Sequence, residues 1–299
     1  MIILPFFYQE ETIDNLQIKP VPTGVRIFED DFNRKFNASK ISVPLAIKET
    51  MSNNLQFDVV NQESIQGKWT IVRKRNNRHV TTVFPEVLFI VDYSRFADFG
   101  YSERRVMRYY SEFLNSMDIR FQSLTNPRVK FSLSAVLVDK KRDMMPFLKR
   151  NRLRDDRNMI DVEKTLEDFS AYLYDNRQSL PSFDIAILIT KFGLCLRPHW
   201  GRCEIKLAGL ATGIGLACHS DSSKRKTYSI AAIQDIGGPM GVSIATHELG
   251  HLLGADHDGS GLNADCPVNS EYIMEPDLQT IPPLEWSHCS KKQLSKFLK

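Results

Sequence analysis

Strand-like and helix-like patterns of apolar residues alternate along the chain from residue 84 onward. Near-continuous apolar runs at 84–91 and 183–189 are typical of strands buried in a sheet. A third strand is predicted at 129–138, where every second residue is apolar. One side of this strand would carry Val129, Phe131, Leu133, Ala135 and Leu137.

Two helices are predicted between these strands. Apolar residues recur at helical spacing after Ser102 and again after Asp161, and both residues have side chains suited to cap a helix N-terminus. Alternating strands and helices predict an α/β layered domain.

Composition and charge exclude several classes of protein. The 299 residues are 42% hydrophobic and 25% charged, as in ordinary globular proteins. A net charge of +3 is too small for the basic face that nucleic-acid binding needs, so no nucleic-acid partner is expected. No apolar run is long enough to span a membrane. Because Pro5 interrupts the short apolar start, it is not a signal peptide; the protein is cytosolic, or the sequence begins after a signal.

A boundary is predicted near residues 73–82, where a basic, turn-rich segment precedes the first buried strand. Arg75 and Arg78 have the spacing of a processing site, with cleavage after Arg78, although a solvated linker has the same composition. A glycosylation sequon at Asn37 favours secretion. The five cysteines all lie in the last 105 residues, and their odd number favours neither an oxidising nor a reducing compartment.

The segment from His247 to Asp258 contains three of the seven histidines. His247 and His251 are four residues apart, so on a helix both imidazoles project from one face, with Glu248 beside them. Gly254 can adopt the positive φ that ends such a helix and turns the chain back toward a third ligand, His257. Three neutral imidazoles leave one position open for water, which is typical of a catalytic zinc site.

Two other interpretations of this segment account for its residues less well. A surface helix with incidental histidines does not account for the glutamate, the glycine and the third histidine together. A metal site without catalysis is opposed by Glu248, because a carboxylate next to activated water can take its proton and pass it to the leaving amine.

The segment resembles the zinc signature of the metzincin proteases, and Asp258 after the third histidine resembles the adamalysin (reprolysin) branch, which includes ADAM and ADAMTS proteases and secreted arthropod venom and tick salivary enzymes. The resemblance covers residues 83–299 and implies an α/β metzincin catalytic domain. Such a domain has a mixed twisted sheet, long helices, an active-site helix and a small C-terminal subdomain with a Met-turn. Residues 1–82 are then an N-terminal extension or propeptide remnant.

The resemblance also implies roles for residues outside the signature. Met274 would be the Met-turn residue below the zinc. Cys218 and Cys289 resemble the pair that ties the C-terminal helix to the domain, and we expect a second disulfide between Cys195 and Cys203. Cys266 would then stay a free thiol unless it bridges two chains.

The chain also departs from the family pattern. No cysteine precedes residue 195, so no propeptide thiolate can cap the zinc and any latency must be steric. Glu86 and Asp184 match calcium ligands of some relatives, but Lys291 and Lys292 stand where another ligand is expected, so calcium is not assigned.

The expected function is that of a secreted, extracellular zinc endopeptidase, acting as a monomer on protein or peptide substrates with one catalytic Zn²⁺. Zinc would polarise the scissile carbonyl while Glu248 deprotonates the attacking water and then protonates the leaving nitrogen. Leu207–Gly213 resembles the edge strand that holds an extended peptide, although an ordinary buried strand has the same pattern, and Pro282 and Pro283 would shape the specificity pocket. The alternative is a toxin-like binding protein with a vestigial zinc site.

Overall fold

The computed structural model describes residues 57–60, 82–142, 145–196, 198–199, 202–203, 205–267, 272–276 and 283–299. These residues all belong to one compact unit, Leu45–Lys299. The predicted glycosylation site Asn37 and the predicted cleavage site Arg78 lie outside the described residues. Among the described helices, none is both long enough and apolar enough to cross a membrane.

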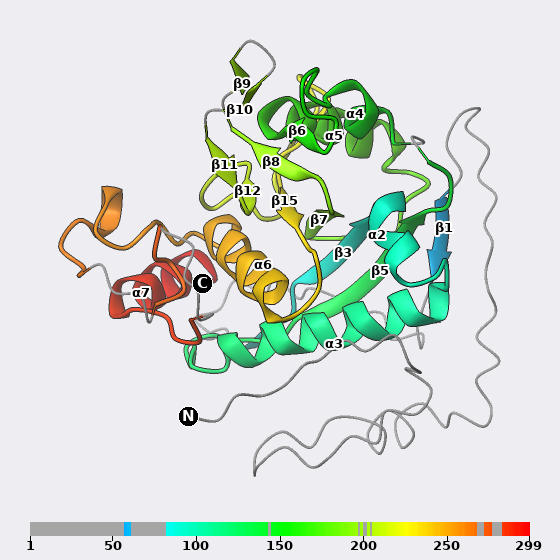
Figure 1. Cartoon of the computed structure of the whole chain (residues 1–299). Coiled ribbons are helices and arrows are strands. Elements are labelled where there is room, and N and C mark those ends of the chain that lie inside the picture. Colours follow the sequence, from blue (N-terminus) through cyan, green and yellow to red (C-terminus); the bar gives the residue numbers. More distant parts are fainter. Residues whose placement is uncertain are drawn as a thin grey trace, which may run out of the picture. The chain divides into compact units, whose positions relative to one another are not determined.

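A six-stranded sheet forms the centre of this unit, in the order β1-β5-β3-β7-β15-β12 (Figure 1). The four inner strands are parallel to one another: β5 (Ser132–Asp139), β3 (Glu86–Val91), β7 (Ile185–Thr190) and β15 (Ile230–Gln234). The two outer strands, β1 (Phe57–Val60) and β12 (Gly209–Ala211), are antiparallel to their neighbours. The sheet is therefore mixed, as predicted, and β1 comes from the predicted N-terminal extension.

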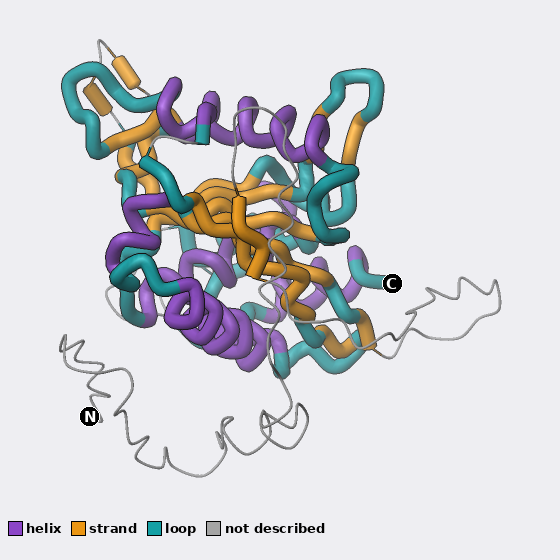
Figure 2. Tube along the Cα trace, turned by 90° about the vertical axis from the view of Figure 1, so that its right-hand side faces the viewer, coloured by secondary structure: helices purple, strands orange, loops and turns teal. Residues whose placement is uncertain are grey.

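Helices cover both faces of this sheet, and Figure 2 shows the strands as a layer between them. On one face lie α3 (Glu103–Phe121) and α6 (Pro239–Leu252). The shorter helices α2 (Tyr93–Asp98) and α7 (His288–Phe297) pack in the same core. On the other face lie α4 (Pro146–Arg150) and α5 (Val162–Asn176). The predicted α/β layered architecture is confirmed.

The alternation of side chains along β3 divides the core into two parts. Val87, Phe89 and Val91 pack in the core that contains α3 and α6. Leu88 and Ile90 point the other way and pack with α4 and α5. Because successive side chains of a strand face opposite sides, a strand buried on both faces is apolar at every position, which is the pattern seen in the sequence.

The third predicted strand differs from its prediction. It is split into β4 (Arg128–Val129) and β5, and its pairing with β3 shifts register between Val87 and Leu88. The extra residue, Ser134, is a bulge that moves the following side chains to the other face. Leu133 therefore packs in the core with α3, whereas Ala135 and Leu137 pack in the core with α5. The prediction that all five apolar residues share one side is wrong for this reason.

The predicted helix starts are confirmed. The Ser102 hydroxyl accepts a hydrogen bond from the Arg105 N–H at 3.4 Å, at the start of α3. The Asp161 carboxylate accepts one from the Lys164 N–H at 3.1 Å, at the start of α5. Each cap satisfies a backbone donor that the helix itself cannot pair.

The remaining elements are short and lie mostly between β7 and α6. A three-stranded sheet has the order β11-β8-β6, and three two-stranded pairs join β2 to β4, β9 to β10 and β13 to β14. Their bounds are β2 Thr82–Val83, β6 Met159–Asp161, β8 Gly193–Cys195, β9 Pro198–His199, β10 Arg202–Cys203, β11 Lys206–Leu207, β13 Ser220–Asp221 and β14 Lys226–Thr227. A 3-10 turn, η2 (Gly261–Asn263), follows α6.

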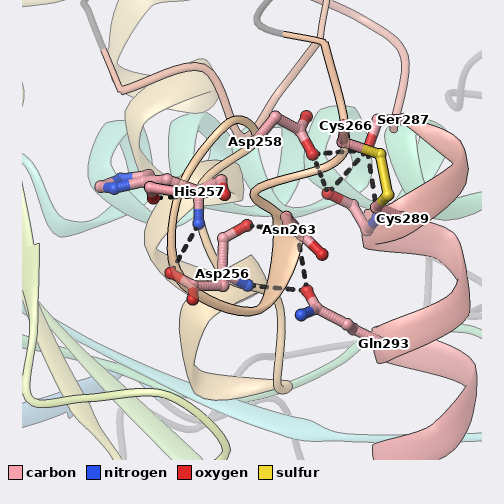
Figure 3. The surroundings of a disulfide bond; sticks show 10 residues. Asp256, His257, Asp258, Asn263, Cys266, Ser287, Cys289 and Gln293 are labelled. Carbon is pink, nitrogen blue, oxygen red and sulfur yellow. Dashed lines mark hydrogen bonds between the residues drawn. A yellow bond between two sulfur atoms is a disulfide. The ribbon is translucent and has the colours of Figure 1, made fainter.

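The cysteine pairing corrects part of the prediction. Cys195 is bonded to Cys203, as expected. Cys289, however, is bonded to Cys266 (Figure 3) and not to Cys218, which is a free thiol. Cys218 is held beside the start of β7, where its N–H donates to the Asp184 carbonyl at 3.0 Å and its thiol lies 3.2 Å from Asp184 Oδ1. Cys266 instead lies on the loop that faces the first turn of α7, within bonding distance of Cys289.

Candidate metal centre

Helix α6 is buried almost all the way round. Ten of its 14 residues are buried, and the helix begins at Pro239 after Gly238, whose φ is 81°. Proline is favoured at the first helical position because its missing N–H would have no partner there. His247 and His251 lie one turn apart on this helix, so its periodicity alone places them on one face.

The helix ends at the glycine that the sequence indicated. Gly254 has a φ of 101°, and its N–H donates to the His251 carbonyl at 2.9 Å, while the Ala255 N–H donates to the Gly250 carbonyl at 2.8 Å. A side chain at residue 254 would also meet Phe297, whose Cβ would lie 2.8 Å from the added carbon. This turn reverses the chain and returns His257 to the two helical histidines.

The three imidazoles converge through their Nε2 atoms. His257 Nε2 lies 3.1 Å from His247 Nε2 and 3.2 Å from His251 Nε2. Within the described ranges, these three residues are the only group of three or more His, Cys, Asp or Glu side chains whose ligand atoms all lie within 4.8 Å of one another. Zinc bonds of 2.0–2.1 Å in a tetrahedral site separate two nitrogens by about 3.3 Å, close to the distances seen here.

Backbone carbonyls fix the orientation of the two helical imidazoles. His247 Nδ1 lies 2.7 Å from the Ile273 carbonyl oxygen, and His251 Nδ1 lies 2.9 Å from the Ala255 carbonyl oxygen. A carbonyl only accepts, so each Nδ1 carries the proton and each Nε2 presents a lone pair. Lone pairs gathered at this distance repel unless a cation lies between them, so the donor set fits a metal ion such as zinc.

Burial keeps these imidazoles neutral. It lowers the pKa of His247 to about 3 and that of His251 to about 4, and it also lowers the pKa of His257. The lowered values follow from the cost of placing a charged imidazolium in a poorly solvated site. At neutral pH the ligands therefore need not lose a proton before they bind a metal.

Glu248, the residue after His247, is buried against strand β12. Burial raises its pKa to about 8, while a hydrogen bond from the Ala211 backbone N–H acts in the opposite direction. The carboxylate reaches the strand because residue 209 is glycine: an added Cβ there would lie 2.6 Å from Glu248 Oε1 and 2.7 Å from Ile244 Cγ2. Sequence analysis identified Glu248 but missed Gly209, whose contact depends on how β12 packs on α6.

Met274 lies in a turn packed against α6. It is fully buried, and a Cβ at Gly250 of α6 would lie 2.7 Å from its sulfur and 2.8 Å from the Trp286 ring. The same turn supplies the Ile273 carbonyl for His247, and the Met274 carbonyl accepts from the Asp258 N–H at 3.0 Å. The turn therefore braces both the helix and the loop that carries the third histidine. The carbonyls missed by sequence analysis give no signal of their own, because every residue has one.

Asp258 connects the metal-site loop to α7. Its Oδ1 accepts a hydrogen bond from the Ser287 hydroxyl at 2.7 Å, and Ser287 in turn caps α7 by accepting from the Ser290 N–H (Figure 3). Asp258 is buried, and burial raises its pKa. The aspartate that follows the third histidine therefore faces the C-terminal helix.

The structure also locates the residues compared with calcium ligands. Asp184 Oδ2 accepts from the Glu86 N–H at 2.9 Å and Oδ1 faces the Cys218 thiol, whose pKa is raised to about 12 chiefly by burial. The Glu86 carboxylate accepts from the Ser182 hydroxyl at 3.1 Å. Lys291 is on α7 and forms an ion pair with Glu285 at 3.6 Å. Pro282 lies outside the described residues, and Pro283 is half-buried.

These features define the class of protein as a metal-dependent hydrolase. They are a mixed sheet, a buried helix with two histidines, a third histidine on the returning loop and a buried glutamate. Comparison with known proteins specifies the family. Residues 84–299 match the Reprolysin (M12B) family of zinc metalloproteases, and the chain belongs to this family.

Individual relatives agree with this assignment. The chain is 37% identical over 225 residues to an "A disintegrin and metalloproteinase with thrombospondin motifs like" protein of Bombyx mori, covering 72% of this chain and 32% of that protein. It is 27% identical to Venom metalloproteinase 3 of Eulophus pennicornis, covering 74% of this chain and 51% of the relative. The chain thus spans a third to a half of the length of these relatives. Among solved structures, archaemetzincin from Methanopyrus kandleri matches with a TM-score of 0.42 and 15% identity, covering 72% of this chain and 96% of that one.

Proposed function

We propose that this protein is a zinc-dependent endopeptidase that hydrolyses peptide bonds of extracellular proteins. The observation that carries the proposal is a buried carboxylate, Glu248, on the same helix as two of three imidazoles whose Nε2 atoms converge. A site that only stores a metal does not need a buried ionisable group, because such a group costs free energy.

His247, His251 and His257 would hold the ion through Nε2. Bound zinc supplies a Lewis acid that polarises a carbonyl and makes water a stronger acid. The chain provides ligands that are already neutral and, for the two helical histidines, already oriented by the Ile273 and Ala255 carbonyls.

Glu248 would act as the general base and then as the general acid. Its carboxylate accepts a proton from the attacking water and delivers it to the nitrogen of the leaving amine. Burial favours this double role, because a carboxyl whose pKa is raised toward neutrality both accepts and releases a proton near pH 7. The Ala211 N–H holds the carboxylate against β12 while this happens.

Strand β12 would bind the substrate backbone. It is the last strand of the central sheet and lies beside α6. The Ala208 carbonyl and the Thr212 N–H bond to β15, so alternation turns the backbone groups of Gly209 and Ala211 to the outer side. An extended peptide could pair with the outward carbonyls and lie across Glu248.

Secretion and processing are part of the proposal. Support for secretion comes from the venom metalloproteinases among the relatives and from the two disulfides. Residues 1–82 would be a propeptide remnant or N-terminal extension that is cleaved after Arg78, and residues 83–299 the protease domain.

The test is hydrolysis of casein by the purified protein, with and without 1,10-phenanthroline. We expect cleavage that the chelator abolishes and that added zinc restores, with a product whose new N-terminus shows an internal peptide bond was cut. The non-chelating 1,7-phenanthroline is the control and should leave cleavage intact. Protein that carries one zinc per chain yet cleaves neither casein nor a peptide library would favour the binding-protein alternative.

A further inference from the structure

The loop that carries His257 is attached to α7 at three places (Figure 3). Ser287 at the helix start donates to Asp258, and Cys289 in the first turn is bonded to Cys266. One turn further along, Gln293 Oε1 accepts two hydrogen bonds, from the Asp256 N–H at 2.9 Å and from the Asn263 side-chain amide at 3.0 Å. The helix therefore holds the loop from its N-cap, its first turn and its second turn.

Helical spacing explains why Cys289 and Gln293 act together. They are four residues apart in α7, so their side chains project from the same face, toward the loop. Leu294, next to Gln293, is fully buried and anchors the helix in the core with α3 and α6. Gln293 thus acts from a helix whose own position is fixed.

The two groups that donate to Gln293, the Asp256 N–H and the Asn263 amide, also fix the backbone next to His257. Asp256 immediately precedes His257, and its Oδ1 accepts from the His257 N–H at 2.8 Å. The amide of Asn263, itself buried, donates both to Gln293 and to the Asp256 carbonyl at 3.0 Å. The peptide groups before and after Asp256 therefore both form hydrogen bonds within one polar cluster around Gln293 Oε1. The second of these peptide groups leads into His257.

From this geometry we propose that Gln293 is a positioning residue for His257, the third metal ligand. The proposal rests on the proposed zinc site. His247 and His251 lie on one rigid helix, whereas His257 is on a loop, so its distance from the other two depends on what holds that loop. Without the Gln293 oxygen, the Asp256 N–H loses this acceptor and the Asn263 amide keeps only the Asp256 carbonyl. The loop can then relax away from the position at which His257 completes the site.

The proposal is tested by comparing the zinc affinity of the parent chain with that of three variants. Gln293→Leu removes the acceptor at similar size, whereas Gln293→Glu keeps acceptor oxygens. Lys292→Leu is a control at an exposed position of the same helix. The dissociation constant for Zn²⁺ is measured by competition with a chromogenic chelator, and circular dichroism checks folding. We expect roughly 10-fold weaker binding for Gln293→Leu, the low end of what outer partners of metal ligands contribute. Gln293→Glu and Lys292→Leu should bind as the parent does, within about twofold.

A double-variant cycle separates positioning from general stability. In a His257→Ala background, Gln293→Leu should weaken zinc binding no further, because the ligand through which it acts is gone. An equal loss in both backgrounds, or unchanged zinc binding by Gln293→Leu, would overturn the proposal. If Gln293→Leu does not fold, Gln293→Ser, which is too short to reach the loop, takes its place with the same expectations. A parent chain that binds no zinc would instead refute the proposed function, so the two failures can be told apart.

Discussion

Helix α6 and the segment that follows it build one site by different physical means. On α6, two proposed ligands and the proposed base are ordered by helical periodicity, and the helix is held by apolar contacts on nearly all sides. The described residues of the following segment form only the short η2 turn and an isolated bridge before α7. The proposed ligand on this segment, His257, is held by hydrogen bonds, the turn at Met274 and a disulfide. The comparison teaches that a local pattern can specify part of a metal site while distant contacts must complete it.

The largest expected effect concerns the glutamate on the helix. Glu248→Ala should lower kcat/KM by about 100-fold to 10,000-fold, because proton transfer is lost while the three histidines remain. Peptide hydrolysis and zinc content are measured on the same preparation, with Glu163→Ala, at an exposed position on α5, as the control. Near-parental cleavage by the Glu248 variant would mean that another group is the base.

A smaller loss of activity is expected when a side chain is added at Gly209, the residue that leaves room for the Glu248 carboxylate. Gly209→Ala places a methyl group within 2.6 Å of Glu248 Oε1, so the carboxylate must move. Displacing a catalytic group by about 1 Å can cost about 100-fold in rate, and we expect a loss of up to that size in kcat with zinc binding preserved. Gly193→Ala is the matched control, because there the closest atoms to an added methyl belong to the flexible Met159 side chain, at 3.2 and 3.3 Å, and the Asn158 carbonyl is at ordinary contact distance. Equal kcat values for the two variants would show that β12 does not constrain Glu248.

The next prediction compares the disulfide that joins the His257 loop to α7 with the disulfide between Cys195 and Cys203. Sequence separations of 23 and 8 residues correspond to roughly 3.5 and 2.5 kcal/mol on the chain-entropy model, so Cys289→Ser and Cys203→Ser should lower Tm by similar amounts. Only Cys289→Ser should weaken zinc binding, because only that bond joins α7 to the His257 loop. Calorimetry and chelator competition give the two readouts, and equal zinc affinities would contradict this assignment.

The last prediction is a pH dependence in the metal-free protein. Burial raises the pKa of Glu248 to about 8, whereas an unfolded glutamate titrates near about 4.3. The folded state thus retains a proton that the unfolded chain loses, so the contribution of this group to stability is present below about pH 4.3 and is lost as the pH rises through 8. Metal-free Glu248→Gln should therefore have a higher Tm than metal-free parent at pH 8.5, and the difference should shrink at pH 4.5. The histidine contributions are common to both proteins and cancel in this difference. A Tm difference that does not change with pH would show that Glu248 titrates normally.

Much of the layered fold could be predicted because its signals are local. The cap at Ser102 and the apolar spacing after it describe α3 without reference to the rest of the chain, and the same holds for Asp161 and α5. The prediction for β5 failed because a bulge at Ser134 depends on how the strand pairs with β3. A periodic pattern does not reveal where an extra residue is inserted.

The sequence by itself determined which residues of α6 share a face and where the helix ends, since one turn of helix and one positive-φ glycine involve only near neighbours. Tertiary structure alone decided which cysteine joins Cys289, why residue 209 has no side chain and what holds the loop of His257. The physical reason is that each of these depends on a contact between segments far apart in the chain. The packing of the whole domain sets those distances, and no local spacing encodes them.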